Sequence, residues 1–443
     1  MSLAWNILVT LGSRVAILLL SLISSILLAR MLGPEGRGLF ALVLLLPELA
    51  TSLASLGFDQ AYVVYAGLTP ERRRALVWQS GCLAAAVGSV VAIGCIVFLA
   101  IGAPGFHFLQ KGPFWLYVLA LTTVPARLLL TYWGGIVRGM NRILLMNFVD
   151  VGTKFVSVSL ILAIVGWLRF DVPGAVSVDF ALIIGKLIVF VALLVWLGQW
   201  GRPSFDLGLW KRTARFALPA YGATIAGYLN YRVDQFIIGA LLAPQELAFY
   251  VIAVDIAEQL WILTGAVAGP LLPHLTNVPD RDPAVAATVA RHVMIWTGGA
   301  CLIVFLLADL AIRVLYSSAF SPAVGPLRWL LPGILTLSIG KTVVAELVAR
   351  EKIHYTLWAG IGAVVANIVG NLVLIPRMGI SGAALASSIS YSVLGLIVTW
   401  YYLRETDLPW SALLPRRDDL SAYVTFCRRS VRAFSIASST SKA

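Results

Sequence analysis

The sequence predicts an all-α, polytopic membrane protein of about twelve transmembrane helices, arranged as two homologous six-helix lobes around a central cationic cavity. Composition is the first indication, because 60% of the 443 residues are hydrophobic and only 12% are charged, which is too apolar for a water-soluble protein. The second is a series of long apolar runs, and the third is a weak repeat between the two halves. Membrane-spanning strands would instead alternate between apolar and polar residues.

Each apolar run is long enough to cross a bilayer, since about 20 helical residues span ~30 Å of hydrocarbon. Twelve such runs are present: 8–29, 39–58, 76–101, 114–133, 147–168, 176–198, 216–242, 247–273, 289–312, 329–349, 355–375 and 380–403. The first run has no basic segment before it and no small-residue cleavage site after it. We therefore expect it to be retained as a transmembrane helix.

The distribution of Lys and Arg predicts the orientation of these helices. With a cytoplasmic N-terminus, the cytoplasmic loops and C-terminal tail hold 19 Lys and Arg, whereas the opposite loops hold seven. The positive-inside rule therefore predicts a multi-pass protein of the cytoplasmic (inner) membrane with both termini in the cytoplasm. The net charge of +12 follows from this topology, and we expect no nucleic-acid partner. Arg428, Arg429 and Arg432 of the tail are expected to contact anionic membrane lipids.

An offset of 210 residues aligns the two halves of the chain. The matched residues occupy corresponding spans and loops: Pro34 and Pro244, Phe40 and Tyr250, Glu48 and Glu258, Arg142 and Lys352. Because six spans separate them, the halves share one membrane orientation and are related by an axis along the membrane normal. This divides the chain into an N-terminal lobe at 1–200, a C-terminal lobe at 201–403 and a basic cytoplasmic tail at 404–443. Chance similarity between apolar sequences is the alternative explanation.

Seven cations lie inside the predicted spans, where each costs about 2.5–3.5 kcal/mol at a helix centre, so most must face protein or water. They are Arg14, Arg127, Lys154, Lys186, Arg215, Arg232 and Lys341. Helical spacing suggests two local ion pairs, Asp150 with Lys154 and Asp179 with Lys186. Arg215 is expected to extend its charge to the membrane surface. Arg14, Arg127 and Lys341 have no acid three or four residues away, and a phosphate is a candidate anion for them.

A stripe along the seventh predicted span provides further candidates for substrate binding. Tyr221, Tyr228 and Arg232 recur at helical spacing and share one face, which suits a sugar phosphate. Packing between helices or anchoring at the membrane interface is the alternative role for the tyrosines. Candidate ion-coupling residues are Asp255 and Glu258, three apart on the eighth span, together with Glu48, the repeat partner of Glu258. Either a proton or a sodium ion would suit them, whereas the alternative is polar packing.

The sequence offers no enzymatic motif and no cofactor site. Gly340-Lys341-Thr342 resembles the end of a phosphate-binding loop, but Leu335 occupies the position of the required first glycine. The four cysteines form no CxxC pair, and no histidines stand near them at metal-ligand spacing. We therefore expect neither catalysis nor a bound metal.

Three segments resemble the bacterial polysaccharide flippase family, the polysaccharide transporter branch of the multidrug, oligosaccharidyl-lipid and polysaccharide exporter superfamily. They are Leu28-Ala29-Arg30-Met31-Leu32-Gly33-Pro34-Glu35-Gly36-Arg37-Gly38, Asn230-Tyr231-Arg232-Val233-Asp234-Gln235-Phe236-Ile237-Ile238-Gly239 and Arg377-Met378-Gly379-Ile380-Ser381-Gly382-Ala383-Ala384. The resemblance extends over about residues 8–403. Gln235 departs from the pattern, because the family often has Arg after the aspartate.

The resemblance implies a flippase that moves a polyprenyl-pyrophosphate-linked oligosaccharide by alternating access, coupled to an ion gradient, for O-antigen or other surface polysaccharides. It also implies a polysaccharide polymerase and glycosyltransferases as partners. We expect Arg14, Arg232 and Lys341 to meet at the pyrophosphate. Two alternatives remain open. A cation-coupled multidrug exporter of the same superfamily would have an acid-dominated cavity, and a membrane enzyme of glycan assembly would need a large extramembrane segment.

Overall fold

The protein is a helical, multi-pass membrane protein. The computed structural model describes residues 3–67, 70–103, 107–265, 271, 275, 282, 284–350, 352, 354–416 and 419. These residues form helices and turns, with no β-strand among them. Within them, ten helical segments are long and apolar enough to cross a membrane. Most of the tail, including the three arginines expected to contact lipid, lies outside the described residues.

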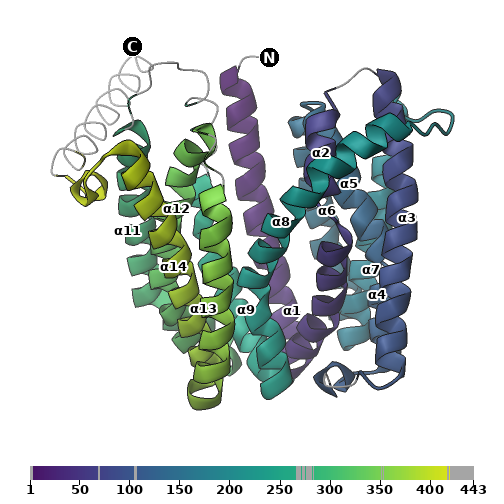
Figure 1. Cartoon of the computed structure of the whole chain (residues 1–443). Helices are drawn as coiled ribbons and strands as arrows, with labels where there is room; N and C mark the ends of the chain where they lie inside the picture. The colour runs from purple at the N-terminus through teal and green to yellow at the C-terminus, as the bar shows by residue number, and fades with distance from the viewer. Residues whose placement is uncertain are drawn as a thin grey trace, which may run out of the picture.

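The helices follow one another with short connections (Figure 1). Those of the first half are α1 Leu3–Ala54, α2 Phe58–Tyr65, α3 Pro70–Ala100, α4 Phe114–Leu121, α5 Val124–Gly139, α6 Ile143–Leu160, with a π-helical continuation at Ile161–Trp167, and α7 Asp171–Trp196. Those of the second half are α8 Leu207–Leu241, α9 Pro244–Gln259, α11 Ala284–Leu315, α12 Val324–Ala349, α13 His354–Met378 and α14 Ile380–Thr406.

Each of the twelve predicted spans coincides with helix over most of its length. The main difference is at the first connection, where we expected a loop and α1 instead continues through a sharp kink. Gly33 forms the kink with φ 65°, a conformation that residues with a side chain rarely adopt, and Pro34 follows it. The two arms of α1 therefore correspond to the first and second spans. The fourth span is divided between α4 and α5, and the seventh lies within α8.

Three clusters of buried apolar side chains form the core. One joins both halves, combining Leu28 and Val124 of the first with Tyr250 and Leu327 of the second. The other two are separate: one packs the end of α1 with α3, α5, α7 and the start of α8, and the other packs α11, α12, α13 and α14 with residues 412 and 413. The halves are thus joined at one end of the molecule, which we call the closed end, and each has its own core at the other, the open end.

Contacts across the closed end hold the two halves together. A Cβ built on Gly38 would lie 1.8 Å from the carbonyl oxygen of Pro244, so the second arm of α1 and the start of α9 touch through their backbones. Arg30 donates to the carbonyl oxygens of Leu315 (2.7 Å) and Val314 at the end of α11. Lys111 donates to the carbonyl oxygens of Gly239 and Leu242 at the end of α8, at 3.0 and 2.7 Å. Burial lowers the pKa of Lys111.

Helix α8 belongs to both halves. Its first turns pack into the core of the first half through Leu209 and Ala217, whereas Ile238 near its end lies in the shared core. In Figure 1 it runs obliquely from the upper right to the lower centre. The starts of α1, α3 and α8 and the end of α14 lie on the same, upper side of the molecule, as an even number of spans requires.

Candidate functional site

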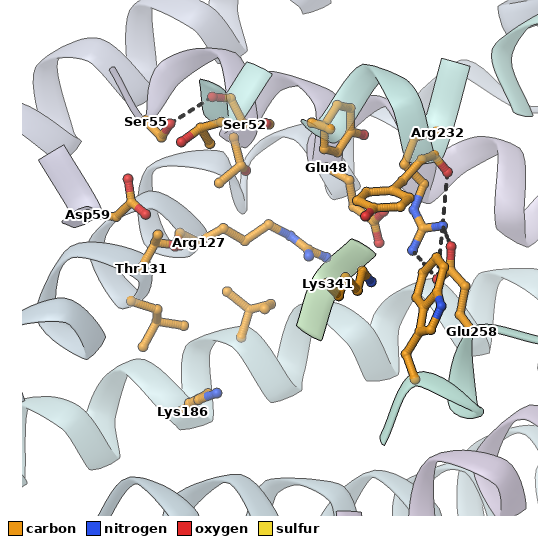
Figure 2. A pocket seen from close by; sticks show the side chains of 17 residues that line it. Glu48, Ser52, Ser55, Asp59, Arg127, Thr131, Lys186, Arg232, Glu258 and Lys341 are labelled. Atoms are coloured by element: carbon orange, nitrogen blue, oxygen red, sulfur yellow. Dashed lines mark hydrogen bonds and ion pairs between the residues drawn. The ribbon is translucent and has the colours of Figure 1, made fainter. Parts of the chain in front are cut away.

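A cavity of about 720 Å³ lies between the two halves. Polar, charged and aromatic side chains from α1, α2, α5, α7, α8, α9 and α12 surround it, and we call it the central cavity (Figure 2). Its lining residues are Glu48, Thr51, Ser52, Ser55, Asp59, Arg127, Leu130, Thr131, Ile183, Lys186, Thr224, Tyr228, Tyr231, Arg232, Glu258, Trp261 and Lys341. The cavity extends toward the open end, where Ser55 and Asp59 follow the end of α1.

Three of the four cations in this cavity are held in ion pairs between helices. Arg232 Nη1 lies 3.3 Å from Glu258 Oε1, joining α8 to α9. Arg127 Nη2 lies 2.5 Å from Asp179 Oδ2, joining α5 to α7. Lys186 Nζ lies 2.8 Å from Asp150 Oδ1, joining α7 to α6. These contacts explain how the bilayer tolerates the three charges.

The two local ion pairs predicted from helical spacing are wrong. Asp150 pairs with Lys186 and not with Lys154, and Asp179 pairs with Arg127 and not with Lys186. The physical reason is that these side chains point toward a neighbouring helix, where a partner is closer than one along their own helix. Spacing within one helix cannot reveal such a partner.

Lys341 is the exception among the cavity cations. Its ammonium lies 3.2 Å from the centre of the Trp261 ring and 5.3 Å from that of Tyr231, which are cation–π contacts. Among the described residues it forms no ion pair with a carboxylate. Aromatic rings stabilise a cation without neutralising it, so the positive charge of Lys341 remains available to an anion in the cavity.

The acids of the central cavity are Glu48, Asp59 and Glu258. Glu48 lies on α1, is exposed to the cavity and forms no ion pair within the described part of the chain. Glu258 forms an ion pair with Arg232. In Figure 2 the side chains of Arg127, Lys341 and Arg232 are directed toward the middle of the cavity, on the same side as Glu48 and Glu258. The centre of the cavity therefore holds charges of both signs.

Two of the predicted substrate-binding residues do not line this cavity. Arg14 is exposed, and its Nη1 lies near Gly265. Arg14 is absent from the residues that line the central cavity, whereas Arg232 and Lys341 are among them, so the three do not meet there. Tyr221 donates from its hydroxyl to the carbonyl oxygen of Leu53 at 2.7 Å and ties α8 to the end of α1. Of the predicted stripe, only Tyr228 and Arg232 face the cavity.

Asp255 lies in a separate polar cavity of about 360 Å³ between α1, α6, α7 and α9. Its carboxylate is 3.6 Å from Arg37 Nη2 and accepts a hydrogen bond from Ser25. Lys154 and Asp179 also line this cavity. Asp255 and Glu258, which we expected to form one ion-coupling site, therefore line different cavities. Asp179 connects the two cavities, because it lines the one that contains Asp255 and forms an ion pair with Arg127 of the central cavity.

Several polar residues of the site were missed by sequence reasoning. Ser52, Ser55 and Thr131 add hydroxyl groups to the central cavity, and Asp59 adds a carboxylate at its open end. Hydroxyl residues are common in transmembrane helices, so nothing in the sequence distinguishes these from others. Trp261 carries a signal, since it stands three residues after Glu258 and therefore shares its helical face.

The second half also contains a buried polar network that the sequence analysis did not predict. Asp234 accepts hydrogen bonds from the hydroxyls of Tyr250 (2.5 Å) and Ser387 (2.8 Å). Asn230 accepts one from Ser390, and its backbone carbonyl accepts one from Asn367. The network connects α8, α9, α13 and α14, which fixes the end of α8 in the second half.

Comparison with known proteins identifies the family. The family model described as "Polysaccharide biosynthesis protein" matches residues 3–277. This chain belongs to that family. The expectation drawn from the three sequence segments is thereby confirmed. No curated protein matches this family member significantly.

Solved structures with the same fold are flippases and transporters. "Lipid II flippase MurJ" in an inward closed conformation matches with a TM-score of 0.77 and 14% identity, covering 93% of this chain and 89% of that one. An inward-facing multidrug resistance MATE family transporter of the MOP superfamily matches with a TM-score of 0.71 and 15% identity, covering 90% and 98%. An outward-facing transporter of that description gives 0.58 and 14%, covering 90% and 94%. The polysaccharide biosynthesis protein therefore has the MurJ and MATE fold.

Proposed function

We propose that the protein is a flippase that moves a polyprenyl-pyrophosphate-linked oligosaccharide across the cytoplasmic membrane by alternating access, for surface polysaccharide synthesis. The observation that carries this proposal is Lys341, a cation in a cavity between the two halves that is held by aromatic rings and, within the described part of the chain, not by an ion pair with an acid. A pyrophosphate is an anion that such a site would attract. Membership of the polysaccharide biosynthesis family supports a glycan substrate.

The cavity offers different surfaces to the different parts of this substrate. Lys341 would contact the pyrophosphate as a point charge, and Arg232 would contribute a guanidinium that is already oriented by Glu258. Ser52, Ser55 and Thr131 would exchange hydrogen bonds with sugar hydroxyls toward the open end. These interactions offset the loss of water around the phosphates and sugars.

Alternating access would exchange the open and closed ends. The separate cores of the two halves leave the cavity accessible from the open end, which the distribution of Lys and Arg assigns to the cytoplasm. Release on the other side requires the contacts of Arg30, Lys111 and Gly38 with the second half to break. Protonation or sodium binding at Glu48 or Glu258 is our proposal for the coupling step, because both carboxylates line the cavity.

The alternative function is export of cationic drugs, and the similarity in fold to MATE family transporters favours it. Such a protein would need an excess of acids in its cavity. This cavity has no such excess, because its acids are outnumbered by its cations. The cations are Arg127, Lys186, Arg232 and Lys341, and the acids are Glu48, Asp59 and Glu258. We therefore place the flippase first, and we propose transport, not catalysis.

Deletion of the gene, followed by complementation with variants, tests the proposal. The deletion strain should accumulate lipid-linked oligosaccharide in the cytoplasmic leaflet and lose the corresponding surface polymer. Wild-type protein and Lys211→Gln, which removes an exposed lysine outside the cavity, should restore the polymer, whereas Lys341→Gln should not. A strain with normal surface glycans and altered drug sensitivity alone would establish the drug exporter instead.

A further inference from the structure

A smaller pocket of about 220 Å³ lies beside the central cavity, within the second half of the molecule. The two share Tyr231 and Lys341, so Lys341 stands at their boundary. The character of the smaller pocket is different, because most of its lining is apolar: Leu337, Val344, Leu357, Leu394 and Val398, together with glycine and alanine. Besides the shared Tyr231 and Lys341, its polar residues are Asn230 and Thr356. We call it the apolar pocket.

Glycines define where this pocket has room. A Cβ built on Gly227 of α8 or on Gly360 of α13 would meet no heavy atom within 4 Å, so both face open space. Gly340 on the α12 side differs, since a Cβ there would lie 2.7 Å from the Cα of Gly395 on α14. The pocket is therefore closed by tight packing of α12 against α14 and is unfilled between α8 and α13.

We propose that the apolar pocket binds the first one or two isoprene units of the lipid carrier, those bonded to the pyrophosphate. This inference rests on the proposed function. The carrier chain and the oligosaccharide leave the pyrophosphate in opposite directions. With the phosphates at Lys341, the sugars would extend into the central cavity, and the pocket on the other side of Lys341 would receive the apolar end. From the central cavity through Lys341 to the apolar pocket, the surroundings change from polar to cationic to apolar. The substrate changes in the same order, from sugars to pyrophosphate to prenyl chain.

The size of the pocket agrees with this ligand. An apolar cavity of about 150 Å³ holds a benzene molecule, so 220 Å³ accommodates roughly five to ten carbon atoms, which is one or two isoprene units. The remainder of a long polyprenyl chain does not fit and would stay in the bilayer. The proposal makes the units nearest the phosphates a point of recognition for the carrier.

Two probes with the same headgroup test the pocket, methyl diphosphate and geranyl diphosphate, measured by calorimetry on the purified full-length protein in lipid nanodiscs. Wild-type protein should bind geranyl diphosphate at least about tenfold more tightly than methyl diphosphate, because the two isoprene units bury apolar surface. The double variant Gly227→Leu/Gly360→Leu fills the pocket and should lose this advantage, with methyl diphosphate binding unchanged. Gly222→Leu is the matched control on α8, since it also faces open space but lines neither cavity.

The outcomes separate this inference from the proposed function. If wild-type protein binds both probes equally, or if the double variant keeps the tenfold advantage, the pocket assignment is overturned while diphosphate binding stands. If neither probe binds, the proposed function and the inference both fail. A photoreactive geranyl diphosphate gives a measurement that needs no substitution. Its crosslinks should map to residues 226–227 of α8 and 357–360 of α13, and crosslinks elsewhere would refute the assignment.

Discussion

At the scale of single residues, the cations of the central cavity fall into two groups. Some form ion pairs that hold helices together, and Lys341 keeps a charge that can attract a ligand. Arg127 and Lys186 each have a carboxylate on a neighbouring helix, and that carboxylate does not line the cavity. Lys341 has aromatic rings instead. Removal of a paired charge should therefore affect folding, whereas removal of Lys341 should mainly affect binding.

The pair of Arg127 and Asp179 gives the clearest test of this separation. Arg127→Gln leaves the Asp179 carboxylate, which is 22% exposed, without its partner, and we expect a loss of about 3 kcal/mol in the free energy of unfolding. Arg127→Gln/Asp179→Asn removes both charges and should recover most of the loss, while Lys341→Gln should change stability little. Thermal melting of the three purified variants measures this. Equal destabilisation by the single and the double variant would show that the pair does not stabilise the fold.

A second ion pair joins the start of α11 to the segment after α14. Asp419 accepts from Arg291 Nε at 3.0 Å and from the backbone N–H of Arg416 at 2.9 Å. Burial acts to raise the pKa of the Asp419 carboxyl, but these hydrogen bonds and the positive charge of Arg291 outweigh it, so the net pKa is lowered. The charged form is thus favoured in the folded protein.

Stability should therefore depend on pH through Asp419. A depressed pKa contributes stability that is fully present above the unfolded value, about 3.9, and is lost as the pH falls through the lower folded value. We expect wild-type protein to melt at a higher temperature than Asp419→Asn from neutral pH down to about pH 5, and the difference to shrink in stronger acid. A difference that instead grows on acidification contradicts this account.

At the scale of elements, the crossing of α1 and α9 determines how closely the two halves approach. These helices contain the best match of the internal repeat, Pro34 with Pro244, and Gly38 packs against Pro244 itself. The repeat thus places equivalent helix starts face to face at the closed end. Glycine at position 38 is required by the close approach and not by its backbone angle.

Substitution at this crossing should be costly. Gly38→Ala places a methyl group 1.8 Å from a backbone oxygen that cannot rotate away, so the helices must separate. We expect a loss near the upper part of the range of about 1–3 kcal/mol that is typical of overpacked sites, measured as a lower melting temperature. Gly152→Ala on α6, where the added Cβ meets nothing within 4 Å, is the control and should melt like wild type. Similar melting of both variants would mean that the crossing is looser than described.

At the scale of the whole molecule, one shared core and two separate cores would let the halves move as bodies about the closed end in the proposed alternating access. Arg30 and Lys111 of the first half fasten this end by donating to carbonyl oxygens at the ends of α11 and α8, where helix dipoles are negative. Most of these hydrogen bonds are exposed and the one from Lys111 to Gly239 is partly buried, so water can replace them when the end opens.

Loss of the hydrogen bonds of Arg30 and Lys111 should shift the protein toward the conformation in which the cavity opens on the other side of the membrane. In a cysteine-free background with a single cysteine at Thr131 in the central cavity, Arg30→Gln/Lys111→Gln should increase labelling by an impermeant thiol reagent added outside intact cells. Arg313→Gln, which removes an exposed arginine paired with Asp309 on its own helix, is the control for charge loss. Unchanged labelling would show that other contacts keep this end closed, and labelling of a cysteine at Arg73 from outside would reverse the proposed topology.

The sequence predicted the helices well, because apolar runs of bilayer length have few other solutions. Six of its candidate site residues line the central cavity, and their roles stay predictions: Arg127, Tyr228, Arg232, Lys341, Glu48 and Glu258. It did not predict the partners of these residues, since an ion pair such as Lys186 with Asp150 joins separate helices whose relative rotation no local pattern specifies. It grouped Arg14 with Arg232 and Lys341, but Arg14 does not line the central cavity, because a position along a span does not reveal which way the side chain faces.

The path of α8 has a mechanical consequence. With 35 residues it is a rod of about 52 Å, gripped by the first half at one end and by the second half at the other. A rod clamped in two bodies cannot act as a slack tether between them. Any rotation of one half must tilt or bend α8, so the covalent connection itself transmits torque. The rotations of the two halves therefore remain coupled through α8 even when every contact between their surfaces has opened.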